Sequence, residues 1–162
     1  MTLMASRIAL RWLVARTTVA VPLLAFMLGG CTSERDPVPA ACLDGRQAIT
    51  RALERAPAAV TLTGATKLST CISRSRTDSE LQTIGSTLLG AADDLSARAA
   101  SDEVAALRLG YLVGATRRGV GANPGLATQL GRRLEQTTRV DGASAGARAA
   151  LRSGLRAGED SG

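Results

Sequence analysis

The chain has 162 residues, the length of one domain, and contains no histidine and only three aromatic residues. Base-stacking surfaces are built mainly from aromatic rings, so this composition argues against a nucleic-acid partner. The formal net charge is +6, but Arg7, Arg11 and Arg16 lie near the start, where no acidic residue occurs. Removing these three from the 20 basic residues leaves 17 against 14 acidic ones, a net charge of +3. That balance is ordinary for a soluble surface and lacks the basic stripe of a nucleic-acid binder.

Residues 1–30 have the organisation of a secretory signal. A basic start is followed by an apolar run at residues 17–28, and small residues follow that run. The run is too short to cross a bilayer as a helix, which takes about 20 residues. We therefore expect residues 1–30 to direct export and to be removed.

The end of this run is Leu28-Gly29-Gly30-Cys31. It resembles the lipobox of bacterial lipoproteins, in which an aliphatic and two small residues precede an invariant cysteine. The resemblance covers residues 1–33 and implies cleavage between Gly30 and Cys31 and lipidation of Cys31. Lipid chains on Cys31 would anchor the protein in the cell membrane on its extracytoplasmic side. The alternatives are a chance cysteine after an ordinary signal peptide and an uncleaved anchor.

The stretch after the signal predicts a tether, and the two remaining cysteines predict a disulfide. Residues 31–41 are polar, contain two prolines and show no helical periodicity, so we expect a flexible tether. Once Cys31 is lipidated, Cys42 and Cys71 form an even pair in an oxidising compartment, which favours a disulfide. A zinc site is the weaker alternative, because the chain offers neither histidine nor a CxxC pair.

Apolar periodicity predicts an all-α domain over residues 42–157. We expect a small antiparallel bundle of about four helices with one disulfide-stapled loop. A first helix is predicted over residues 43–56, where Pro57 ends it. Residues 58–75 suit a loop with one helical turn, although their β-branched residues leave a short strand pair open.

The clearest helix begins at Thr77-Asp78-Ser79-Glu80, which has the spacing of a capping box. An apolar stripe of about 22 residues follows. The next helix is predicted to begin at Ser101-Asp102-Glu103, a cap followed by acids, with Val104 on its buried face.

Two further helices complete the expected bundle. Asn123-Pro124 predicts a cap and a first turn, and leucines follow at four-residue intervals (Leu126, Leu130 and Leu134). The last segment, residues 144–156, is Ala-rich but weakened by glycines, and we expect residues 158–162 to be a disordered tail.

Gly110 and Gly114 form a GxxxG pattern, a spacing that lets two helices approach closely. Arg108, Arg117 and Arg118 flank it and argue against a lipid-embedded helix. We expect contact with a neighbouring helix inside the bundle, with a dimer face as the alternative.

The pairs Arg117/Arg118 and Arg132/Arg133 are candidate anion contacts. Their guanidinium groups suit phosphate or headgroup oxygens. The plainer interpretation is a solvated face that nearby Glu135 neutralises in part.

No pattern in the chain predicts catalysis. A triad lacks its histidine base, the glycine-rich stretch lacks a P-loop lysine, and the paired acids have simpler roles on helix surfaces and caps. We therefore expect no enzyme and no cofactor. The main hypothesis is a membrane-anchored domain that binds a protein partner in the cell envelope. The alternatives are a binder or carrier of an anionic or acyl small molecule, and a purely structural spacer.

Overall fold

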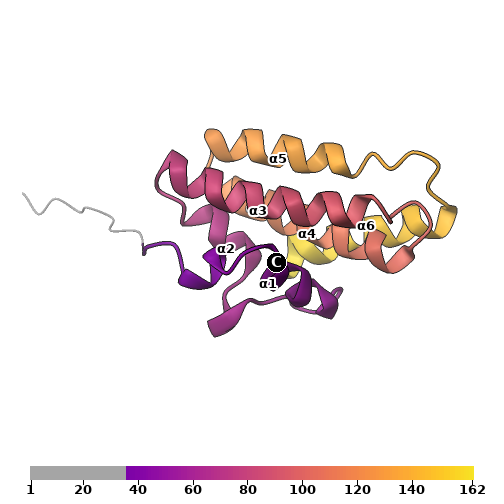
Figure 1. The fold of residues 1–162 in the computed structure, drawn as a ribbon, viewed down its shortest axis with the longest axis horizontal. Coiled ribbons are helices and arrows are strands. Elements are labelled where there is room, and N and C mark those ends of the chain that lie inside the picture. The colour runs from indigo at the N-terminus through magenta and orange to yellow at the C-terminus, as the bar shows by residue number, and fades with distance from the viewer. Residues whose placement is uncertain (1–35) are drawn as a thin grey trace, which may run out of the picture. The chain divides into compact units, whose positions relative to one another are not determined.

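The computed structural model describes residues 36–162, and every regular element in this part of the chain is a helix (Figure 1). An isolated bridge between Thr61 and Lys67 is the one extended pairing there. The prediction of an all-α bundle is confirmed. The α-helices are α1 (Arg46–Ala52), α2 (Leu68–Ser73), α3 (Asp78–Ser96), α4 (Glu103–Ala122), α5 (Leu126–Thr137) and α6 (Ala145–Ser161). Short 3-10 segments are η1 (Ala40–Leu43), η2 (Leu53–Arg55) and η3 (Thr63–Ala65).

Helix α4 is the centre of the fold. It packs against α2, α3, α5 and α6, and all its residues from Leu109 to Thr116 are buried. A helix that is covered on every side has no polar face, so this stretch is apolar all round. Val104 was predicted to be buried but is 56% exposed, because neighbouring helices do not cover that side of the first turn. The cap is Asp102 and not the predicted Ser101, because the Asp102 carboxylate accepts the backbone N–H groups of Val104 and Ala105.

Tyr111 is the one aromatic residue in the described part of the chain, and it is fully buried in α4. Its hydroxyl accepts the backbone N–H of Val60 at 3.0 Å. It also lies 3.0 Å from the hydroxyl of Ser161, which donates its own proton to Ala157. The tyrosine therefore donates to Ser161 and joins α4 to the loop before α2 and to the end of α6.

Helices α4 and α6 form the largest interface of the fold, and glycines lie along both sides of it. A Cβ atom on Gly110 or Gly114 would collide with carbonyl oxygens of α6. A Cβ atom on Gly154 or Gly158 would collide with carbonyl oxygens of α4. The GxxxG pattern thus marks a helix contact inside the domain, as predicted, and the two backbones touch directly.

The long helices alternate in direction along the chain, so α4 and α6, which are separated by α5, run parallel. Gly146, in the first turn of α6, packs on Glu103 at the start of α4. Gly158, one turn before the end of α6, packs on Tyr111 and Ala115. This parallel packing becomes available because α5 runs back along α4 and α3 before α6 begins.

The end of the chain differs from the prediction. Residues 158–162 were expected to be disordered, but α6 continues to Ser161 and Gly162 is buried. Glycine has a low intrinsic helix propensity, so the glycines of α6 predict a weak helix. Here they allow α6 to reach the backbone of α4, and the packing outweighs their intrinsic cost.

Helix α3 begins as predicted. Thr77 accepts the backbone N–H of Glu80, and the Glu80 carboxylate accepts the backbone N–H of Thr77, which completes the capping box.

The predicted cap at Asn123 is wrong, because α5 begins two residues after Pro124, with Gly125 as its cap. Asn123 instead ends α4 and donates its side-chain amide to the carbonyls of Ile72 and Ser75.

The disulfide closes the segment before α3 on itself, and α2 packs this segment against α4. Residues 58–75, left open as loop, strand or short helix, contain η3, the isolated bridge and the short helix α2. α1 begins at Arg46 and passes into η2, which ends before Pro57 as predicted. The expected tether at residues 31–41 reaches the domain earlier than predicted, because Val38 and Ala41 pack against the core.

Candidate functional site

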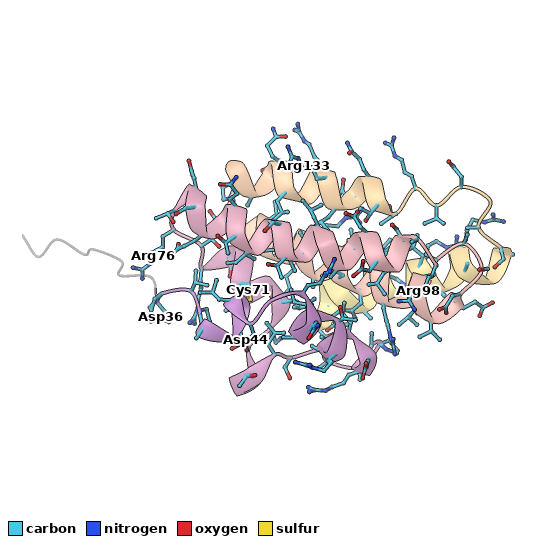
Figure 2. The ribbon with its side chains drawn as sticks, viewed as in Figure 1. Asp36, Asp44, Cys71, Arg76, Arg98 and Arg133 are labelled. Atoms are coloured by element: carbon cyan, nitrogen blue, oxygen red, sulfur yellow. A yellow bond between two sulfur atoms is a disulfide. The ribbon has the colours of Figure 1, made fainter. Side chains whose placement is uncertain are left out.

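The predicted lipidation and cleavage residues, Gly30 and Cys31, lie outside the described residues. The predicted disulfide is present between Cys42 and Cys71, which are both buried (Figure 2). It links η1 to α2 across a sequence separation of 29 residues. In the chain-entropy account, a loop of this length contributes roughly 3–4 kcal/mol to stability.

Two of the predicted anion contacts, Arg117 and Arg118, are engaged within the domain. Arg117 donates to the carboxylates of Glu159 and Glu135, both at 2.9 Å. The Glu159 carboxylate, and after it that of Glu135, raises the pKa of the Arg117 guanidinium above its ordinary value. Arg118 donates to the backbone carbonyls of Glu159 and Asp160, in the last turn of α6. These arginines therefore hold the C-terminal end of α6, where carbonyls lack helix partners and the dipole favours cations.

Arg132 and Arg133 lie exposed on α5, and within residues 36–162 neither forms an ion pair. Figure 2 shows Arg133 on this helix. They differ in what they face. Arg133 lines the space between α3 and α5, whereas Arg132 faces a separate hollow beside Glu135. The four predicted arginines thus do not form a common anion site.

The space between α3 and α5 is a groove made of two hollows that share Leu89 and Arg133. The hollow near the start of both helices has a volume of about 610 Å³ and the second one about 640 Å³. We call the two together the α3–α5 groove. The first hollow is lined by Asp78, Leu81, Gln82, Gly85, Ser86, Leu89, Gln129, Leu130 and Arg133.

The groove has an apolar floor and charged sides of opposite sign. Leu81 and Leu130 are nearly buried beneath it, and Leu89 is half-buried at its middle. Asp78 and Asp93 belong to the α3 side, and Arg133 belongs to the α5 side. Arg139 and Asp141, in the connection after α5, add one charge of each sign to the second hollow. An occupant would therefore meet leucine side chains at the centre, carboxylates along one edge and a guanidinium group along the other.

Gly85 and Leu130 set the depth of the groove in its first hollow. A Cβ atom on Gly85 would lie 3.1 Å from a terminal methyl of Leu130, so the leucine packs directly over the glycine. Sequence reasoning missed the groove. The sequence pattern that could have indicated it is a pair of small residues, Gly85 and Ser86, in a helix that is otherwise rich in leucine.

Among residues 36–162, no three His, Cys, Asp or Glu side chains are grouped so that they could hold a metal ion. In the same part of the chain, no helix has the length and apolar character needed to span a bilayer.

Comparison of the chain with protein-family models, with curated proteins and with solved structures finds no match.

Proposed function

We propose that the chain is a lipoprotein tethered to the extracytoplasmic side of a cell membrane, where its helical domain binds an amphipathic helix of an envelope protein. The α3–α5 groove carries the binding part of this proposal. It runs along two parallel-running helices, and its floor of Leu81, Leu89 and Leu130 suits the apolar stripe of an incoming helix.

The charges at the groove define what the partner helix should carry. Asp78 and Asp93 favour basic side chains over α3, and Arg133 favours an acidic side chain over α5. Charge complementarity of this kind contributes mainly to the choice of partner and to the rate of association. A helix with the reverse charge order would place like charges together and bind weakly.

The tether rests on different support. Leu28-Gly29-Gly30-Cys31 resembles a lipobox. The Cys42–Cys71 disulfide suits an oxidising compartment outside the cytoplasm. The intact mass of protein extracted from host membranes tests this part. We expect a chain that starts at Cys31 and carries a diacylglyceryl group; an unprocessed or unlipidated mass would contradict the anchor.

Photocrosslinking in intact cells tests the groove. A photoreactive residue at Ser86 or Gln129, both exposed groove positions, should capture one repeatable partner, and one at Gln47 on α1 should not. Arg133→Glu should lower the crosslinked yield about tenfold, because it places a carboxylate opposite the partner's acidic residue.

Arg132→Glu is the matched control, since it makes the same charge change on the next residue, outside the groove. The yield should stay near that of the unmodified sequence. Equal losses for Arg132→Glu and Arg133→Glu would show a general charge effect and would contradict specific binding in the groove.

A further inference from the structure

A separate cavity lies between the loop that ends α3, the first half of α4, the α5–α6 connection and the first half of α6. Its volume is about 300 Å³. Ala99, Ala106 and Ala147 form a buried floor, and the half-buried side chains of Val140 and Leu151 complete the apolar wall. Val140 also lines the second hollow of the α3–α5 groove, as do Arg139 and Asp141, whereas the three alanines and Leu151 do not.

Three exposed arginines, Arg139, Arg148 and Arg152, line the same cavity. Within the part of the chain that the structure describes, none of the three takes part in an ion pair. Arg148 donates to the carbonyl of Ala143, which orients its side chain and uses one of the five guanidinium N–H groups. Asp141 is the single acidic residue among the lining residues, so the cavity keeps an excess of two positive charges.

This arrangement differs from the one at the other end of α6. There Arg117 has two carboxylate partners, and Arg118 caps helix carbonyls. At the cavity, three guanidinium groups surround an apolar floor with most of their donors still open. A guanidinium group forms paired hydrogen bonds with a carboxylate, and the floor offers aliphatic contact beside it.

We propose that this cavity binds a medium-chain aliphatic carboxylate, with the carboxylate held by Arg148 and Arg152 and the chain lying on the alanine floor. A volume of about 300 Å³ is at the small end of ligand pockets. It holds one aliphatic chain and excludes a whole diacyl lipid. Arg148, Arg152 and the alanine floor lie outside the α3–α5 groove, so the proposed ligand contacts do not depend on a protein partner.

Octanoate is the probe, with two matched controls: acetate has the charge without the chain, and 1-octanol has the chain without the charge. Binding is measured by ¹H–¹⁵N NMR on the full chain with Cys31→Ser, which prevents lipidation. Octanoate should shift the backbone amides of Ala106, Val140 and Ala147 in a saturable way. Acetate and 1-octanol should each bind at least about tenfold more weakly, since each lacks one of the two interactions.

Arg148→Gln combined with Arg152→Gln should weaken octanoate binding about tenfold or more, because the charge-assisted hydrogen bonds are lost. Arg156→Gln is the control for the loss of positive charge. It lies one turn further along α6, is exposed and does not line the cavity, so affinity should change less than about twofold.

Three results would overturn the proposal. The first is that octanoate shifts none of the lining amides. The second is that acetate or 1-octanol binds as well as octanoate, which would leave a bare anion patch or a bare apolar cleft. The third is that the double variant binds octanoate unchanged. Arg133→Glu should leave octanoate binding intact, so failure here and failure of the groove proposal are separate results.

Discussion

The α4–α6 and α3–α5 helix pairs both run parallel, but they are held together in different ways. Between α4 and α6, glycines on both helices bring backbone against backbone. Between α3 and α5, the contact at Gly85 is made by the side chain of Leu130, and a groove remains along the pair. A backbone contact leaves no room for an occupant and cannot adapt. A side-chain contact can repack, so the adaptable surface of the domain is the α3–α5 pair.

The strongest test of this contrast is Gly114→Ala in α4. The new methyl group would collide with the backbone carbonyl of Leu155, and a helix backbone cannot move away without disturbing the whole interface. We expect a loss of about 3 kcal/mol in the free energy of unfolding, the upper end for overpacking by a small group. Chemical denaturation of both forms measures it.

Gly121→Ala is the matched control, because it is the same change in the same helix. A Cβ atom on Gly121 has open space around it, so only helix propensity changes. We expect a gain of about 0.5–1 kcal/mol. Equal effects of the two substitutions would show that backbone contact does not define the α4–α6 interface.

Leu130→Ala tests the α3–α5 pair. Leu130 is 7% exposed and covers Gly85, so its removal enlarges the groove at its floor. We expect a loss of about 2 kcal/mol, at the low end for Leu→Ala, because water can enter a space that is already open to solvent. Denaturation gives the value; a loss as large as that of Gly114→Ala would mean that both pairs are equally rigid.

Much of the fold follows from local sequence signals. The capping box at Thr77 and Glu80 depends on residues three apart, so spacing alone identifies it. The Cys42–Cys71 disulfide follows from the count of cysteines left after export. The contact at Gly110 and Gly114 follows from small residues one turn apart, whichever helix they face.

The features that could not be predicted depend on distant parts of the chain. The length of α6 was underestimated because the cost of its glycines is local, whereas their benefit comes from α4. Arg117 was a candidate anion contact, with partial neutralisation by nearby Glu135 as the plainer interpretation. The structure pairs it with Glu135 and also with Glu159, which is 42 residues away and had no local signal. The α3–α5 groove is a space left between two helices, so no single segment encodes it.

Thr77→Ala tests whether the capping box fixes the start of α3, one wall of the groove. The free energy of unfolding should fall by about 1 kcal/mol in chemical denaturation, because the side chain that accepts the Glu80 N–H is lost.

Backbone hydrogen bonds from Arg76 and then Thr77 lower the pKa of Glu80 below its ordinary value of 4.5. The stabilisation by Glu80 is therefore present above pH 4.5 and is lost as the pH falls through the lowered pKa of the folded state.

Glu80→Gln isolates the contribution of the Glu80 charge. The stability difference between the unmodified chain and Glu80→Gln should be constant near neutral pH and should shrink as the pH falls below 4.5. Denaturation at a series of pH values measures it. A difference that stays constant to acidic pH would show that the ionised carboxylate does not hold the start of α3.

Gly85→Ala should have the smallest effect and separates the two kinds of contact most directly. The new methyl group would lie 3.1 Å from a terminal methyl of Leu130, which can rotate away. The cost of this close contact should nearly cancel the gain in helix propensity, so we expect the free energy of unfolding to change by less than about 0.5 kcal/mol.

A second substitution distinguishes the two kinds of contact. In a Leu130→Val background, Gly85→Ala should become stabilising, because the side-chain obstacle is removed. Leu155→Val should not rescue Gly114→Ala, because the obstacle there is a carbonyl oxygen that every residue carries.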